Sequence, residues 1–326
     1  MIKLFQKSIA VQLITLMVLL TIMWWNRIVH PVGMPTPSGA DPLYGLMYLL
    51  FGQLPLLATI VAILLHITCG ALLNNLLYNR GLIHSNSLIP MLLYIMAMGL
   101  VPEAQSLTPQ AFTNLLLLLM LRILIATDNR FILNPEQLFG VAALLSSLSL
   151  FYFPLLTMAL PLITILILIY KLYNWHDISL LILGFLAPYL LLFFVAFMTD
   201  RLAPIAEAMR QALFTWEFQL PHLAPLRIVT YISFGLLLLL AFFFFVGFSA
   251  NKTVVYRNNG SIVVLTLIGA ILLLPYIPHY STEVQAFAIP FAFVGSLWII
   301  NNKIKSWITN VLVTLWTALC LINCNI

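Results

Sequence analysis

Two acidic residues, Asp41 and Glu103, are the strongest candidates for chemistry in this chain. Only 7% of the residues are charged, and an unpaired charge in hydrocarbon costs on the order of 3 kcal/mol, so an acid between apolar segments needs a reason. Asp41 precedes Pro42 in SGADPLYGLMYLLFG, which is typical of a helix N-cap followed by proline. A carboxylate there is either a cap or a general base, and Glu103, in GLVPEAQSLTP, is either a turn or loop residue or a second functional acid.

Other polar side chains within apolar segments are few. His66 and Asn74 share a run with Cys69, and a buried histidine bonded to a neighbouring helix is the simpler interpretation, with a ligand or proton relay as the alternative. Cys320 and Cys324 are four residues apart without an accompanying histidine, which favours packing over metal binding. No metal site or cofactor is therefore assigned.

The composition predicts an integral membrane protein. Of the 326 residues 63% are hydrophobic, whereas a soluble domain carries roughly 25% charged residues. Apolar runs recur throughout, so residues 1–326 are expected to form a single transmembrane domain. The 14 basic residues are scattered, which argues against a nucleic-acid partner. Nucleotide-binding and hydrolase motifs such as GxxxxGK[ST], GxSxG and HExxH are missing, which argues against an ATP-driven pump.

Apolar runs long enough to cross a membrane predict an all-α polytopic bundle. A span needs about 20 helical residues, and eleven runs qualify, with a range of nine to twelve because some are short. They are 8–26, 54–78, 87–101, 108–126, 134–151, 153–170, 178–198, 227–248, 261–277, 284–300 and 306–323. The fifth and sixth meet at FYFP, which predicts a tight hairpin or a re-entrant feature.

The basic residues predict the orientation of the chain, because Lys and Arg near span ends stay in the cytoplasm. With the predicted spans, ten of the 14 lie on the same side of the membrane as the N-terminus: Lys3, Lys7, Arg80, Arg122, Arg130, Lys171, Lys252, Arg257, Lys303 and Lys305. Arg27, Arg201, Arg210 and Arg227 lie on the opposite side. We therefore expect a cytoplasmic N-terminus and a periplasmic C-terminus.

Two outer loops, 27–53 and 199–226, are long enough to hold structure. A short helix is expected to begin at Pro42 and lie on the membrane surface. In the second loop, APIAEAMRQALF places Ile205, Met209, Ala212 and Leu213 on one stripe, which predicts an interfacial amphipathic helix over 204–214.

Two stretches, 74–125 (NNLLYNRGLIHSNSLIPMLLYIMAMG onward) and 139–194 (FGVAALLSSLSLFYFPLLTMALP onward), resemble an uncharacterised multi-pass inner-membrane family of Bacteroidetes-type bacteria. The resemblance covers roughly residues 60–200 and implies location in the bacterial inner membrane. It implies no particular chemistry.

More distantly, the order of features resembles the GT-C glycosyltransferases, which take a sugar from a polyprenyl-phosphate carrier. Asp41, Glu103 and GVAALLSSLSLFYFP stand where that family has its two loop acids and a later G-LLGLASL-P span. The resemblance implies that Asp41 is a base, that Glu103 binds a divalent ion or the acceptor, and that Arg201, Arg210 or Arg227 holds the phosphate.

Two other functions fit the same sequence. A transporter or flippase for a lipid-linked or small-molecule substrate would use broken helices with polar midplane residues, for which Gly70, Asn74, Asn75 and Pro188 are candidates, together with His66. A non-catalytic membrane scaffold is the third possibility. Membrane lipids, and under the first hypothesis a polyprenyl phosphate, are the expected partners.

Overall fold

The computed structural model describes residues 5, 8–83, 87–100, 105–125, 131–214, 225–274, 284–301 and 306–325. Within these ranges every regular element is helical and there is no strand. The α-helices are α1 Ile9–Val29, α2 Pro42–Phe51, α3 Pro55–Asn79, α4 Ile89–Met98, α5 Pro109–Leu124, α6 Pro135–Phe151, α7 Ala159–Leu168, α8 Trp175–Met198, α9 Leu202–Phe214, α10 Pro225–Ser249, α11 Val254–Leu272, α13 Ala288–Asn301 and α14 Ser306–Asn325. Two 3₁₀ helices, η3 Phe153–Met158 and η5 Val284–Phe287, lead into α7 and α13.

Proline marks the start of many of these helices. Pro42, Pro55, Pro109, Pro135 and Pro225 are each the first residue of a helix. Proline suits this place because its fixed φ fits a helix and its missing N–H would have no partner in the first turn. Helix starts are therefore encoded locally.

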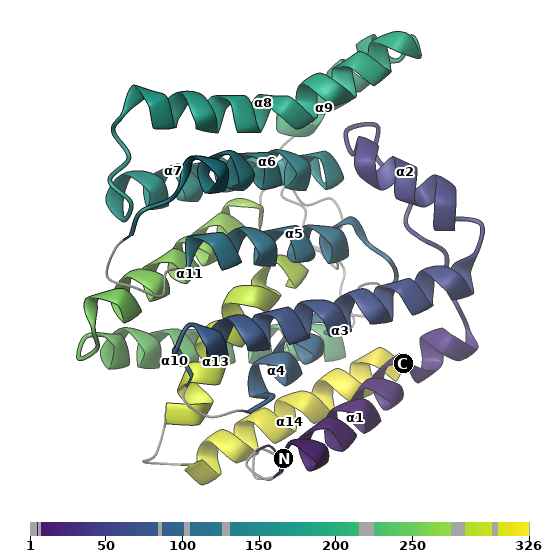
Figure 1. The fold of residues 1–326 in the computed structure, drawn as a ribbon. Coiled ribbons are helices and arrows are strands. Elements are labelled where there is room, and N and C mark those ends of the chain that lie inside the picture. The colour runs from purple at the N-terminus through teal and green to yellow at the C-terminus, as the bar shows by residue number, and fades with distance from the viewer. Residues whose placement is uncertain are drawn as a thin grey trace.

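The helices form a stack with a fully buried centre. In Figure 1, α8, α6, α5, α3 and α1 follow one another down the picture, with α10, α11 and α13 beside them. All ten residues of α4 are buried, as is α13 from Ala288 to Ile299, and the two helices pack against each other. Helices that are apolar on every side belong inside such a bundle.

The outermost helices expose their apolar side chains. In α8 only Gly184, Tyr189 and Ala196 are buried, while Leu191 and Phe197 are 69% and 66% exposed. Five helices, α1, α3, α8, α10 and α11, are long and apolar enough to cross a membrane. Long apolar helices with exposed apolar side chains indicate a membrane-embedded protein.

Helices occur at all eleven predicted runs, although some are short. The run 87–101 contains the ten-residue α4, which is only about 15 Å long at 1.5 Å per residue. The helix at the ninth predicted run, α11, starts at Val254 rather than residue 261. The Thr253 hydroxyl caps it there by accepting a hydrogen bond from the N–H of Tyr256 at 3.4 Å.

The FYFP segment forms a tight hairpin. Only Tyr152 separates α6 from η3. The chain then returns toward the end of the stack where α6 begins, since the Tyr170 hydroxyl after α7 donates to the carbonyl of Leu124 at the end of α5.

Candidate functional site

Most helices of the stack run from left to right in Figure 1, and α2 and α9 lie at their right-hand end. Asp41 is the residue immediately before α2. The helix α2 begins at Pro42 as expected. The Asp41 side chain, however, makes no capping bond to α2. The predicted N-cap role is therefore wrong for the carboxylate, although the Asp41 carbonyl does accept the N–H of Gly45 at 2.9 Å.

The Asp41 carboxylate instead bonds to two other segments. Its Oδ1 accepts the backbone N–H of Phe153 at 2.8 Å, and its Oδ2 accepts the Ser38 hydroxyl. Phe153 is the first residue of η3, 112 positions along the chain. An acid at a helix N-terminus complements the free N–H groups there, so Asp41 caps a distant helix and ties the first loop to the α6–η3 turn.

Burial makes Asp41 unusual as an acid. The residue is 5% exposed, and this desolvation raises the pKa of its carboxyl to about 6, although the bonds from Ser38 and Phe153 oppose the shift. A carboxylate whose pKa lies this close to neutrality is suited to accept a proton from a substrate. The same group is still largely ionised at pH 7.

Tyr44, one turn after Asp41, joins the first loop to the segment 105–108. Its hydroxyl contacts the carbonyl of Pro35 at 2.9 Å and that of Leu107 at 3.1 Å. In the same segment, Gln105 donates to the Met23 carbonyl at 3.0 Å near the end of α1. Glu103 lies outside the described residues, so its pairing with Asp41 stays a prediction, but the neighbouring segment does reach the Asp41 end.

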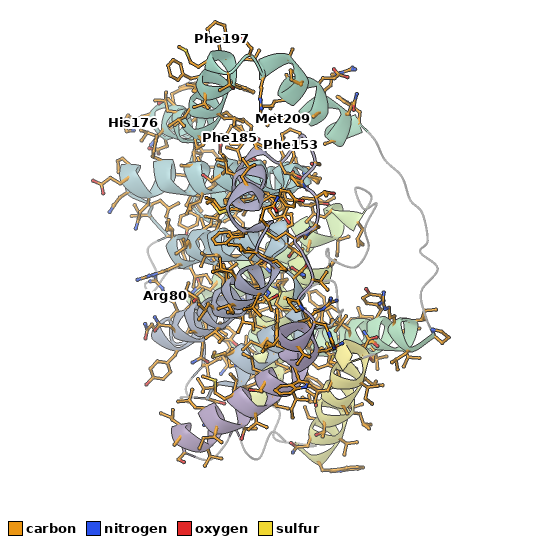
Figure 2. All side chains as sticks on the ribbon, turned by 90° about the vertical axis from the view of Figure 1, so that its right-hand side faces the viewer. Arg80, Phe153, His176, Phe185, Phe197 and Met209 are labelled. Atoms are coloured by element: carbon orange, nitrogen blue, oxygen red, sulfur yellow. The ribbon has the colours of Figure 1, made fainter. Side chains whose placement is uncertain are left out.

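The helix α9 packs over this region. Met209 is buried in a small cluster with Ala40, Leu150, Phe153 and Tyr189, and Figure 2 shows Phe153, Phe185 and Met209 close together beneath α9. Residues Ile205 and Ala212 pack on the same cluster. The apolar stripe expected to lie in the membrane surface therefore contacts the protein itself. The side chain of Leu213 lies outside the described residues.

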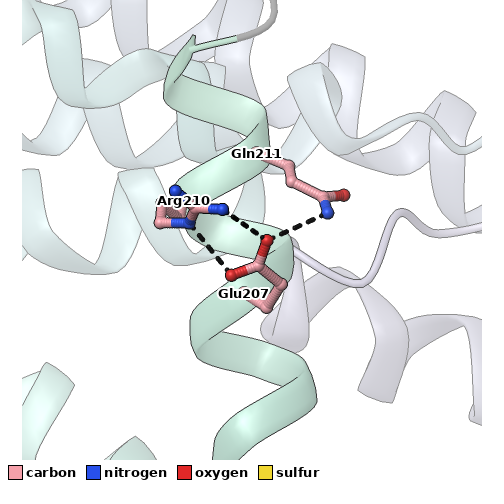
Figure 3. Close-up of polar contacts among 3 residues, drawn as sticks. All are labelled: Glu207, Arg210 and Gln211. Atoms are coloured by element: carbon pink, nitrogen blue, oxygen red, sulfur yellow. Dashed lines mark hydrogen bonds and ion pairs between the residues drawn. The ribbon is translucent and has the colours of Figure 1, made fainter.

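The arginines expected to hold a phosphate are not gathered at one place. Arg201 is exposed before α9, and Arg210 is exposed on it. Arg227 is half-buried on the first turn of α10, which lies lower in the stack (Figure 1). Figure 3 shows that Arg210 already binds Glu207 through two bonds, Nε–Oε2 at 2.9 Å and Nη2–Oε1 at 2.8 Å.

His66 and Asn74 lie elsewhere, along α3. His66 is 1% exposed, with the ring of Trp24 5.5 Å away between centroids. Within the described residues neither of its ring nitrogens has a hydrogen-bond partner, so the expected bond to a neighbouring helix is not formed. Asn74 is half-buried. The structure does not bring these two residues to Asp41.

Sequence reasoning missed the partners that define the Asp41 environment. Two of these contacts, Tyr44 with Leu107 and Phe153 with Asp41, are made only through the tertiary fold. Ser38 carried a weak signal, because a hydroxyl three residues before an acid is well placed to bond to it. Nothing in the sequence indicates the 112-residue link to Phe153.

Comparisons with known proteins give no relative for this arrangement. No protein-family model, no curated protein and no solved structure matches the chain.

Proposed function

We propose that the chain is a multi-pass protein of a bacterial inner membrane, with about eleven spans (nine to twelve), a cytoplasmic N-terminus and a periplasmic C-terminus. Side-chain bonds at the two ends of the stack support the alternation of spans. Leu88, before α4, donates to Gln12 in the first turns of α1, while Asn323, at the end of α14, donates to Leu100, after α4. The scattered basic residues support the orientation.

Reporter fusions test this topology. A fusion after Lys171 is expected to report the cytoplasm, and one after Glu217 the periplasm. The opposite result at Lys171 would refute the orientation, and the same side for both would refute the passage of α8 through the bilayer.

At the periplasmic end we propose a glycosyl transfer from a polyprenyl-phosphate sugar, with Asp41 as general base. One observation carries the proposal: Asp41 is a buried carboxyl with a pKa raised to about 6, at an end of the stack covered by helices too short or too polar to span. Maintaining a desolvated carboxylate is costly, and such groups concentrate at functional sites.

The proposed reaction transfers the sugar from the phosphate oxygen of the carrier to an acceptor hydroxyl. Oδ1 accepts the N–H of Phe153 and Oδ2 accepts the Ser38 hydroxyl. In the proposed reaction Oδ2 takes the proton of an acceptor hydroxyl, and the rotatable Ser38 hydroxyl gives up its bond to that oxygen. The acceptor oxygen attacks the anomeric carbon, the bond from that carbon to the phosphate oxygen breaks, and polyprenyl phosphate leaves with the electron pair. Arg201 and, after release from Glu207, Arg210 would stabilise the departing phosphate.

Activity measured on the reconstituted protein tests the proposal. Proteoliposomes are given a panel of polyprenyl-phosphate sugars with hydroxylated acceptors, and released polyprenyl phosphate is measured. Asp41→Asn is expected to lower the rate roughly 10²- to 10⁴-fold, the usual contribution of a general base. Glu136→Gln, an exposed acid at the opposite end, is the matched control. Full activity of Asp41→Asn, or no turnover of any donor by the unmodified protein, would contradict the proposal.

A further inference from the structure

A second polar region lies at the opposite end of the stack, where α3 and α5 finish side by side. A pocket of about 170 Å³ opens there, lined by Asn75, Asn79, Arg80 and Arg122 together with four leucines of the two helices. Arg80 follows the last residue of α3, and Arg122 lies in the last turn of α5. Figure 2 shows Arg80 at the margin of the molecule, away from Phe153 and Met209.

Arg80 is held in place by a backbone carbonyl rather than by a counter-ion. Arg80 donates from Nη2 to the carbonyl of Arg122 at 2.9 Å, which fixes its guanidinium over the end of α5. Among the described residues, neither arginine has a carboxylate within the 4.0 Å of an ion pair. Helix C-termini favour nearby cations, which accounts for one arginine at each helix end. It does not account for a pocket that opens between the two.

The contents of the pocket define the chemistry of its ligand. Guanidinium and amide groups are donors that match phosphate oxygens. An engineered cavity of about 150 Å³ holds benzene, so a space of this size admits a phosphate group. The leucines, among them the buried Leu76 and Leu118, form an apolar wall beside the polar one. A lipid needs both walls, because its phosphate is polar and its acyl chains are apolar.

We propose that this pocket binds the phosphate headgroup of an anionic phospholipid. Basic pockets between membrane helices are suited to such headgroups. The site is separate from Asp41, and it does not depend on the proposed glycosyl transfer. A bound lipid phosphodiester carries one negative charge, so it would offset half of the charge of the two arginines and bridge the ends of α3 and α5.

Lipid binding by the full chain tests the proposal. The protein is purified in detergent, titrated with phosphatidylglycerol or phosphatidylcholine, and bound lipid is counted by native mass spectrometry. We expect one tightly held phosphatidylglycerol in preference to phosphatidylcholine. The double variant Arg80→Gln, Arg122→Gln should bind it roughly thirtyfold more weakly, given about 1 kcal/mol for each basic residue and tenfold for each 1.4 kcal/mol.

A matched double variant separates the pocket from general charge. Lys252→Gln with Arg257→Gln removes two exposed cations near the α10–α11 turn, which lies at the same left-hand side of Figure 1 as the ends of α3 and α5. Its affinity for phosphatidylglycerol should stay within about twofold, the effect of dispersed charges being small. Equal loss in the two double variants, or no loss in the first, overturns the site.

Two further arms keep the test independent of the arginine–carbonyl bond. Asn79→Asp places a negative charge at the exposed rim and should weaken phosphatidylglycerol binding about tenfold, the effect of one repulsive contact; unchanged binding overturns the proposal. Inorganic phosphate, titrated into the detergent-purified protein, distinguishes the two sources of phosphate. Phosphate that binds more tightly than phosphatidylglycerol and displaces it would show a free-anion site and refute the lipid assignment.

Discussion

At the Asp41 end of the stack a carboxyl group is 5% exposed and bonded to two segments, whereas at the Arg80 end two arginines lie at the rim of an open pocket. The cationic side chains keep their contact with water, so their charge costs the fold little. The carboxylate has lost most of its hydration, and its raised pKa measures that cost. The two ends should therefore respond to substitution in opposite ways.

The largest expected effect on stability is at Asp41 and depends on pH. Because the carboxyl pKa is raised from 3.8 to about 6, the folded state holds the proton more tightly than the unfolded state. The free energy of unfolding therefore falls as pH rises from about 4 to about 6 and levels off above that. Two pKa units correspond to about 3 kcal/mol.

Asp41→Asn should remove this dependence. The amide oxygen can still accept the Phe153 N–H, so we expect the variant to be up to about 3 kcal/mol more stable than the unmodified protein at pH 7 and equally stable at pH 4. Denaturant unfolding in detergent at the two pH values measures the difference, with Glu136→Gln as control. A variant that is less stable at both pH values would show that the bonds of the Asp41 carboxylate outweigh the cost of its burial.

An intermediate effect is expected at Tyr44. The side chain is 1% exposed and its hydroxyl bonds the Pro35 and Leu107 carbonyls, so Tyr44→Phe should lower the free energy of unfolding by about 1–3 kcal/mol, the cost of leaving buried acceptors unpaired. Tyr48→Phe, half-buried on the next turn of α2, is the control. Equal effects in the two variants would show that the link between the loops is not made by hydrogen bonds.

Local signals in the sequence predicted much of the helical framework. The helix expected at Pro42 and the runs predicted from residues 54 and 108 match the starts of α2, α3 and α5 to within one residue. Each of these helices begins with a proline, which acts through its own backbone geometry. The apolar run 261–277 placed the start of α11 too late, because the helix begins with polar turns at Val254, after the capping residue Thr253.

The candidate site was less predictable, because its interactions are long-range. Asp41 was identified as important, but the partner that decides its role, Phe153, is 112 residues away. Met209 and Ile205 were correctly placed on one face of a helix, yet periodicity alone does not say whether that face meets lipid or protein. The cluster with Ala40 and Phe153 decides for protein.

The smallest expected effect is at the ion pair on α9. Glu207 accepts two bonds from Arg210 and one from Gln211 at 3.1 Å, and these bonds lower its pKa. Both partners face solvent, where the attraction is screened by salt and offset by the loss of side-chain freedom. Glu207→Gln should therefore leave the thermal midpoint in detergent unchanged, at low and at high salt. If the midpoint falls at low salt alone, the pair contributes to stability, and the contrast with Asp41 is one of degree.

The same variant also releases Arg210, so under the proposed reaction it should retain or raise the rate of phosphate release. A loss of activity in a protein of unchanged stability would exclude free Arg210 as a phosphate ligand.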